Sequence, residues 1–153
     1  AGNPLLCKNL PMRGQIESRR SERRVTSPQT LRLGCLNVRG CSTLESKRCE
    51  IGGMFLERKM DVLALCETKM KGKGEMEFGD VTGRVSGVER GRAREGVALL
   101  LSEWLMRLAV EWRGVSSRLM WVRVRIGREC WAFVSAYGPG CEKSEEERDV
   151  FLE

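Results

Sequence analysis

The chain of 153 residues contains no histidine. Imidazole is the side chain that most often serves as a general base near neutral pH, so a mechanism that needs one cannot run on this chain alone. No C-x-x-C pair occurs either, although zinc sites normally contain closely spaced thiols or imidazoles. We therefore do not expect a zinc centre.

Long apolar runs are also missing. No stretch approaches the roughly 18 consecutive apolar residues of a membrane-spanning helix. Residues 1–8 contain no long apolar segment of the kind found in secretory signals. We therefore expect a soluble protein inside the cell, nuclear or cytoplasmic, with no membrane partner. Apolar residues make up 41% of the chain, enough for one globular domain with a buried core.

The chain contains seven cysteines, an odd number. Three of them, Cys35, Cys66 and Cys130, lie in apolar segments that have the pattern of strands. In an intracellular protein, such cysteines usually stay reduced and serve as small core residues. We expect that role for these three.

Positive charge is concentrated at the start of the chain. The net charge is +6, and residues 1–30 supply +4 of it, with six basic and two acidic side chains. These 30 residues are rich in Arg, Ser, Pro and Gln and show no hydrophobic periodicity, which predicts a disordered tail. Such a tail either adds non-specific affinity for a phosphate backbone or simply stays solvated.

Regular patterns begin after this tail. Residues 31–38 predict a first strand, and the apolar run at residues 61–66 predicts a second. Between them, Ser42 and Glu45 match a capping box that opens a helix extending to about Lys59. A strand, a helix and a strand in this order place the two strands side by side and parallel.

The predicted helix carries an apolar stripe formed by Leu44, Ile51, Met54 and Phe55. Gly52 and Gly53 lie inside the helix, and each costs roughly 1 kcal/mol relative to alanine. Packing against the rest of the protein must therefore hold the helix.

Each of the two predicted strands is followed by a polar side chain. Asn37 ends the first strand, and Glu67 ends the second. Ligands commonly bind where neighbouring parallel strands end. A carboxylate beside an amide suits Mg²⁺, which often takes only one or two protein carboxylates. The alternatives are a solvated carboxylate at Glu67 and a turn residue at Asn37.

The remaining chain predicts further strands. Residues 69–75, rich in glycine and lysine, predict a flexible loop. Strand patterns follow at residues 80–88, 96–102, 108–112, 118–126 and 130–137, and Ser144 with Glu147 opens a last helix. One β-helix-β unit followed by an antiparallel meander predicts an α/β fold, part of a sandwich rather than a doubly wound sheet.

Four short motifs carry a resemblance to a known family. They are Leu36-Asn37-Val38-Arg39-Gly40, Val62-Leu63-Ala64-Leu65-Cys66-Glu67-Thr68-Lys69, Gly96-Val97-Ala98-Leu99-Leu100 and Ser135-Ala136-Tyr137-Gly138-Pro139. In order and spacing, residues 31–153 resemble the endonuclease/exonuclease/phosphatase superfamily. They are most similar to the endonuclease domain of non-LTR retrotransposons and to the craniofacial development protein 2-like proteins derived from it.

The resemblance implies a DNase I-like two-layer α/β sandwich and Mg²⁺-dependent hydrolysis of phosphodiesters in DNA. It makes Glu67 the principal protein ligand of the catalytic Mg²⁺, for which Mn²⁺ can often substitute. It makes Asn37 a catalytic residue beside the metal. It also places Tyr137 near the scissile phosphate, where a phenolic hydroxyl stabilises a developing negative charge. Arg39 occupies a position that is acidic in the abasic-site repair branch, which favours the retrotransposon branch.

Two later motifs of the family do not occur in this chain. Gly-Asp-Phe/Leu-Asn and Ser-Asp-His supply the aspartate that activates water, an asparagine at the phosphate, and an Asp-His pair. The sequence reaches Glu153 without either motif. We therefore expect a truncated, N-terminal part of the domain, with exposed apolar surface, unpaired strand edges and little or no activity of its own.

Two other functions stay open. A non-catalytic nucleic-acid-binding remnant would use the basic tail and the sheet rim. A phosphatase of the same fold would act on small phosphoesters or lipids. Tyr137 would then be a packing residue at a strand end. The four tryptophans and the face of Arg123 and Arg125 suit nucleic-acid contacts, but they equally suit a sheet core and a solvated sheet face.

Overall fold

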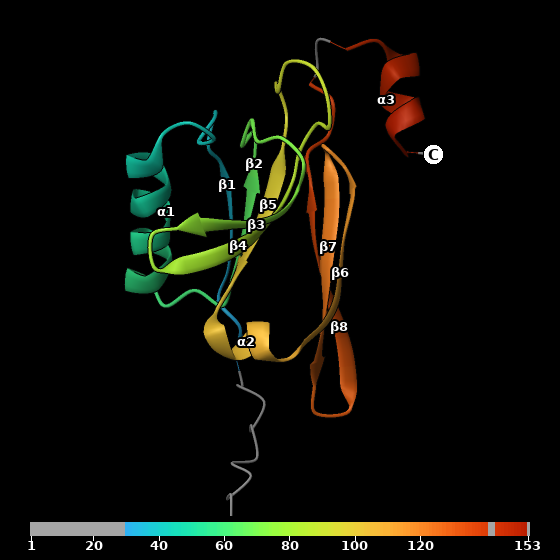
Figure 1. The fold of residues 1–153 in the computed structure, drawn as a ribbon. Coiled ribbons are helices and arrows are strands. Elements are labelled where there is room, and N and C mark those ends of the chain that lie inside the picture. The colour runs from blue at the N-terminus through green and yellow to red at the C-terminus, as the bar shows by residue number, and fades with distance from the viewer. Residues whose placement is uncertain (1–29, 141–142, 153) are drawn as a thin grey trace, which may run out of the picture.

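Two sheets of different size form the framework of the fold (Figure 1). The structure, a computed structural model, describes residues 30–140 and 143–152, so the tail predicted over residues 1–30 lies outside the described residues except for Thr30. The first sheet contains β1 (Leu33–Asn37), β2 (Val62–Cys66), β3 (Lys73–Phe78), β4 (Val81–Ser86) and β5 (Val97–Leu101). The second sheet contains β6 (Ala109–Ser116), β7 (Leu119–Ile126) and β8 (Glu129–Ala136). The helices of the described residues are α1 (Glu45–Glu57), α2 (Glu103–Arg107) and α3 (Glu145–Leu152).

The first sheet has the strand order β1-β2-β5-β4-β3. Its strands β1 and β2 pair in parallel, with Asn37 opposite Cys66, which confirms the predicted β-helix-β unit. The other neighbours in this sheet are antiparallel. β2 and β5 occupy inner positions because they are almost entirely apolar, and a strand covered on both faces needs such a sequence.

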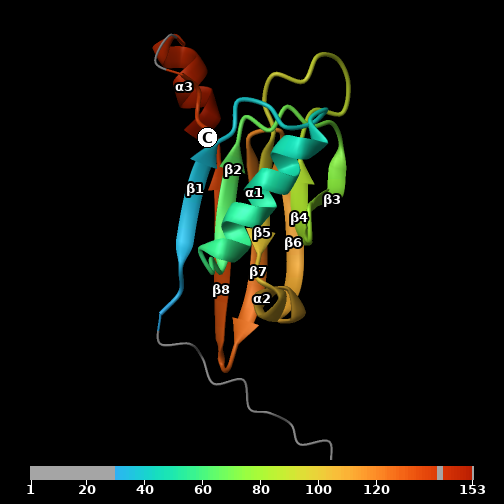
Figure 2. The ribbon, with the colours of Figure 1, turned by 90° about the vertical axis from the view of Figure 1, so that its left-hand side faces the viewer.

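Helix α1 covers one face of the first sheet, and the second sheet covers the other (Figures 1 and 2). Alternate residues of β5 enter the two cores: Ala98 and Leu100 face α1, whereas Val97, Leu99 and Leu101 face the second sheet. The fold is therefore a mixed α/β arrangement of two sheets with few helices, compatible with the predicted α/β sandwich. No helix among the described residues is long and apolar enough to cross a membrane.

The start of α1 differs from the prediction. The helix begins at Glu45, its cap residue is Leu44, and no side chain caps it. The predicted capping box of Ser42 and Glu45 is therefore wrong. The guanidinium of Arg48 donates instead to the backbone carbonyls of Cys41 and Ser42, at 3.0 and 2.8 Å. A side chain from inside the helix thus orders the chain that precedes it.

Gly52 is the point where α1 touches the hairpin of β3 and β4. A Cβ atom at this position would lie 1.7 Å from the carbonyl oxygen of Phe78, whereas a Cβ at Gly53 would meet nothing within 4 Å. The two glycines that the sequence presents as equal breaks in the helix therefore have different roles. Only Gly52 permits the close approach between helix and hairpin.

Strand β3 begins inside the segment predicted to be a flexible loop. Lys73, Gly74 and Glu75 belong to this strand, so the prediction was wrong for its second half. β3 lies at the edge of the sheet and pairs only with β4, and charged side chains are common on such edges. The alternation of Met76 and Phe78 toward the core was the signal of a strand.

The two sheets present free edges on the same side of the molecule, β1 in one sheet and β8 in the other (Figure 2). A largely apolar groove between these strands is lined by residues that include Leu33, Ala64 and Phe133. Leu33 and Val134 are 62% and 55% exposed, so the groove has no cover from the described residues.

The burial of the three strand cysteines depends on whether their strand lies at a sheet edge. Cys66 is buried, as predicted, whereas Cys35 and Cys130 are exposed because they lie on the edge strands β1 and β8. The expectation that these two are core residues was therefore wrong. Cys41, which lies outside any strand, is buried instead. All five cysteines among the described residues are free thiols.

Candidate functional site

The parallel pairing of β1 and β2 brings Asn37 and Glu67 together. Asn37 is the last residue of β1, and Glu67 follows directly after β2. The side-chain amide of Asn37 donates a hydrogen bond of 2.7 Å to Oε1 of Glu67. The two polar strand ends found in the sequence thus meet at one edge of the sheet.

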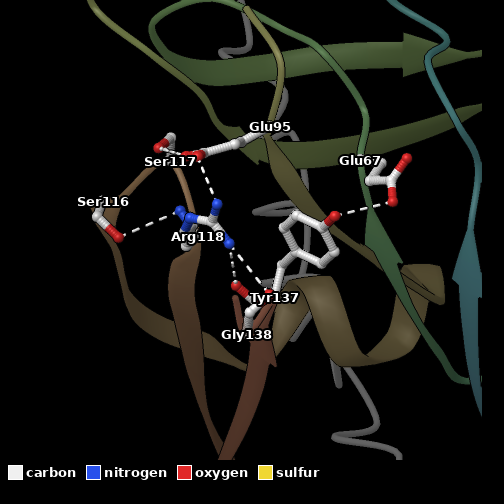
Figure 3. A network of polar contacts seen from close by, with 7 residues as sticks. All are labelled: Glu67, Glu95, Ser116, Ser117, Arg118, Tyr137 and Gly138. Carbon is white, nitrogen blue, oxygen red and sulfur yellow. Dashed lines mark hydrogen bonds and ion pairs between the residues drawn. The ribbon is translucent and has the colours of Figure 1, made fainter. Parts of the chain in front are cut away.

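Tyr137 reaches the same carboxylate from the second sheet. It follows β8 directly, and its hydroxyl donates a hydrogen bond of 2.8 Å to Oε1 of Glu67 (Figure 3). Just below, the buried hydroxyl of Ser135 donates to the carbonyl of Leu65 at 3.3 Å, which ties β8 to β2. The structure therefore places all three predicted site residues, Asn37, Glu67 and Tyr137, in one cluster.

The loops that carry the cluster are bonded to one another through their backbones. The amide of Gly40 donates to the carbonyl of Glu67 at 2.6 Å, and the amide of Cys41 donates to the carbonyl of Thr68 at 3.0 Å. The amide of Thr68 in turn donates to the carbonyl of Gly96 at 3.0 Å. Three separate loops thus fix the backbone around Glu67.

The backbone at the site is locally strained. Among the described residues, four non-glycine residues have a positive φ, and three of them, Arg39, Glu67 and Lys69, lie at this site with φ of 49°, 55° and 55°. A side chain in the left-handed region costs of order 1–3 kcal/mol, and such residues concentrate at ligand-binding sites. The backbone bonds described above hold Glu67 in this conformation.

Glu67 stays ionised at lower pH than an ordinary glutamate. The hydrogen bond from Asn37, followed by the one from Tyr137, holds the pKa of this carboxyl below its usual value of 4.5. Both bonds fall on Oε1, so Oε2 can accept a cation. Because the folded pKa is lowered, the stabilisation from these bonds is present above pH 4.5 and is lost as the pH falls through the folded pKa.

We predict that replacing Asn37 with alanine raises the pKa of Glu67 toward 4.5. The variant removes the larger of the two hydrogen bonds that favour the charged form. A carboxyl ¹³C NMR titration measures the change. Arg39→Ala is the matched control, because Arg39 acts on Glu67 only through its charge and contributes less. A Glu67 that titrates above 4.5 in the unchanged chain, or responds more to Arg39→Ala, contradicts the assignment.

The neighbouring thiol does not compete as a reactive group. Burial raises the pKa of the Cys66 thiol, which lies directly before Glu67 in the chain. The thiol therefore stays protonated near neutral pH, whereas a nucleophilic cysteine needs a lowered pKa. The carboxylate, rather than the thiol, is therefore the ionised group at this strand end.

The donor set suits a hard cation with few protein ligands. Glu67 supplies one ionised and partly exposed carboxylate, and Asn37 adds an amide beside it. Across residues 30–140 and 143–152, no group of three or more His, Cys, Asp or Glu side chains could hold a metal ion. A site with one carboxylate fits Mg²⁺, which keeps several waters, better than a metal that needs a full protein cage.

Basic residues are frequent on the loops at this edge of the molecule. The loop between β4 and β5 rises above it (Figure 1), and its two glutamates are engaged, Glu89 with Lys73 at 3.9 Å and Glu95 with Arg118 at 2.6 Å. Six basic residues on this loop and on the loops that follow β1 and β2 take part in none of the ion pairs among the described residues. We call them the basic rim: Arg39, Lys69, Lys71, Arg90, Arg92 and Arg94.

No model of a known protein family matches the chain, and no curated protein matches it either.

Sequence reasoning missed the residues that support Tyr137. Arg118, Glu95 and Ser117 form a connected network beside the tyrosine (Figure 3). No local pattern in the sequence marked these residues as part of the site. The tryptophans lie elsewhere: Trp112 and Trp121 stack under Arg84 and Arg123 on the sheets.

Proposed function

We propose that the chain carries the metal-binding half of a Mg²⁺-dependent phosphodiesterase site of the endonuclease/exonuclease/phosphatase type. The observation that carries this proposal is the convergence of Asn37 and Tyr137 on one oxygen of Glu67. Asn37 and Glu67 come from the parallel pair, whereas Tyr137 comes from the other sheet. A DNase I-like sandwich, of which residues 31–153 form the N-terminal part, is the finer fold class that goes with this proposal.

Each residue has a defined task in this proposal. Glu67 would hold the cation, and Asn37 lowers the pKa of this carboxylate and fixes its orientation. The hydroxyl of Tyr137 donates its single proton to Oε1 of Glu67. It would have to exchange this hydrogen bond for one to the phosphate in order to stabilise a developing negative oxygen. When bound, Mg²⁺ polarises a phosphoryl oxygen and stabilises the leaving oxyanion.

The chain lacks the groups that complete hydrolysis in this superfamily. It has no histidine, and neither the Gly-Asp-Phe/Leu-Asn motif nor the Ser-Asp-His motif occurs in it. The residues that would activate water and protonate the leaving group are therefore not supplied. We infer that the chain binds the metal but has little or no hydrolytic activity of its own.

The basic rim supports DNA as the substrate of the parent domain. Its six cations lie on three loops, Lys69 and Arg39 act on the charge of Glu67, and cations of this kind neutralise successive phosphates of a nucleic-acid backbone. A small phosphoester offers one phosphate and would not use a rim of this extent. The same observation supports a non-catalytic nucleic-acid-binding remnant as the second candidate function.

The metal site is tested by titrating the chain with Mg²⁺ after labelling tyrosine with ¹³C at Cζ. Tyr137 is the only tyrosine, so one signal reports directly on the group bonded to Glu67. We expect Mg²⁺ to shift this signal in the unchanged chain. Loss of an outer-shell partner costs roughly 10–100-fold in metal affinity. Glu67→Gln should weaken the Mg²⁺ response by at least this much.

The control for this titration is Glu57→Gln. It removes an exposed carboxylate at the far end of α1 and should leave the Mg²⁺ response unchanged. A signal that does not move with Mg²⁺ in the unchanged chain contradicts a metal role for Glu67. An equal loss in both variants means that the ion senses overall charge rather than this site.

Plasmid nicking in Mg²⁺ tests the second half of the proposal. We expect no more than trace nicking by the purified chain. Robust nicking that Glu67→Gln abolishes would show a working enzyme and overturn the inactive-fragment part. Salt-sensitive DNA binding that needs no Mg²⁺ and survives Glu67→Gln, without a Mg²⁺ response at Tyr137, instead identifies the nucleic-acid-binding remnant.

A further inference from the structure

Arg118 contacts Tyr137 in three different ways (Figure 3). Its backbone carbonyl accepts the Tyr137 amide at 2.8 Å. Its Nη1 donates to the carbonyls of Tyr137 and Gly138, at 3.3 and 3.0 Å. Its guanidinium carbon lies 5.1 Å from the centre of the tyrosine ring. These contacts restrain both the backbone and the ring of Tyr137.

Arg118 is itself held from the loop between β4 and β5. Its Nη2 forms an ion pair of 2.6 Å with Oε1 of Glu95, and Oε2 of Glu95 accepts the hydroxyl of Ser117 at 2.6 Å. The side chains of Arg118 and Glu95 are only 23% and 26% exposed, so solvent screens this pair less than a surface pair. The pair therefore gives the guanidinium one defined position.

We propose that Arg118 is the positioning residue for Tyr137 and keeps its hydroxyl on Glu67. The proposal rests on the proposed function, because it concerns the same site. Arg118 acts on Glu67 through the tyrosine. Tyr137 is followed by Gly138 and Pro139, beyond the end of β8, so the strand alone does not fix its ring. The arginine, which lies in the turn between β6 and β7, links that ring to the loop before β5.

Arginine suits this position for a chemical reason. Its planar group offers five donors in a fixed fork and can stack on an aromatic ring at the same time. At Arg118 one side of the fork binds a carboxylate, while the other binds two carbonyls. Lysine carries the same charge, but its compact ammonium cannot make all of these contacts in one geometry.

The same single tyrosine signal tests the proposal without metal. We expect Arg118→Met to move the ¹³Cζ signal of Tyr137 toward that of free tyrosine and to lower the order parameter of its ring. Arg118→Lys should restore the signal only in part. Arg123→Met is the matched control, since Arg123, on the following strand β7, also stacks on an aromatic ring and pairs with a glutamate. It should leave the Tyr137 signal in place.

In a Mg²⁺ titration followed by the Tyr137 signal, Arg118→Met should lower the apparent metal affinity by roughly tenfold. This is the lower end of the roughly 10–100-fold loss expected when an outer-shell partner is removed. An unchanged signal and ring order in Arg118→Met, with a normal Mg²⁺ response in the unchanged chain, overturns the positioning role and leaves the proposed function standing. A signal that moves in Arg118→Met while the unchanged chain ignores Mg²⁺ supports the positioning role and removes the metal function.

Two further variants decide the matter if Arg118→Met does not fold. Arg118→Lys keeps the charge and the stem, and Glu95→Gln keeps the size of the partner but removes its charge. Displacement of the Tyr137 signal in both supports the proposal. A signal at its normal position in both overturns it.

Discussion

Replacing Gly96 with alanine is expected to destabilise the protein by roughly 3–5 kcal/mol, the sum of backbone strain and overpacking. Gly96 has a φ of +128°, which side chains rarely adopt. A Cβ atom would also lie 2.3 Å from Oγ1 of the buried Thr68 and 3.1 Å from the amide of Lys69. Thr68 cannot retreat easily, because its backbone is bonded to Gly96 and Cys41.

The matched control is Gly91→Ala in the same loop. Gly91 also has a positive φ, of +82°, but a Cβ there would meet nothing within 4 Å. It should therefore show only the strain contribution, about 1 kcal/mol at an exposed loop position. Urea unfolding measures both variants, and equal losses of unfolding free energy contradict a steric role for Gly96.

The contact can be isolated by adding Thr68→Ala to Gly96→Ala. Removing Oγ1 takes away the atom that the new Cβ meets, so the double variant should lose less stability than the two single losses predict. If the losses of the two single variants simply add up in the double variant, the destabilisation by Gly96→Ala comes from backbone strain alone. Because Thr68 follows Glu67 directly, Gly96→Ala should also weaken the Mg²⁺ response of Tyr137 in any fraction that stays folded.

Replacing Gly52 and Gly53 with alanine should change the free energy of unfolding in opposite directions. At Gly52 the new Cβ would lie 1.7 Å from the carbonyl oxygen of Phe78, a backbone atom that cannot rotate away. Overpacking of about 3 kcal/mol, less about 1 kcal/mol gained in helix propensity, gives a net loss of about 2 kcal/mol. At Gly53 only the propensity gain applies, because the site is exposed and open.

Urea unfolding of the two single variants tests this difference directly. The variants carry the same chemical change one residue apart, so intrinsic helix propensity cancels between them. A difference of about 3 kcal/mol is expected in the free energy of unfolding. Two variants of equal stability, whether gained or lost, would show that α1 can move away from the hairpin of β3 and β4 without loss.

The part of the site that was predictable from residue patterns is the part made by neighbouring strands. Asn37 and Glu67 end two apolar runs joined by a helix, and parallel pairing alone brings such ends together. Tyr137 is different, because it is 70 residues from Glu67 and belongs to the other sheet. Its place depends on how the sheets pack, and only the resemblance predicted that it lies near Glu67.

Other features depend on contacts that no local pattern reveals. Ser42 and Glu45 have the spacing of a capping box, but Arg48 binds the carbonyl of Ser42 and the helix starts later. Lys73 begins a strand because an edge position accepts its charge. Arg118 was left without a role because its partners, Glu95 and Tyr137, come from two distant segments.

Because β1 lies at a sheet edge, the candidate site can come apart more often than the whole domain unfolds. β1 pairs only with β2, and its Leu33 is 62% exposed, so few buried contacts resist its detachment. Segments of this kind open by local unfolding at a free energy below that of the whole domain. Each opening takes Asn37 away from Glu67 and Leu36 away from the first core, while β2 and β5 stay paired and the second core stays intact. In hydrogen exchange, the amides of β1 should therefore lose protection first, and the candidate metal site would disassemble and re-form many times within the lifetime of one folded molecule.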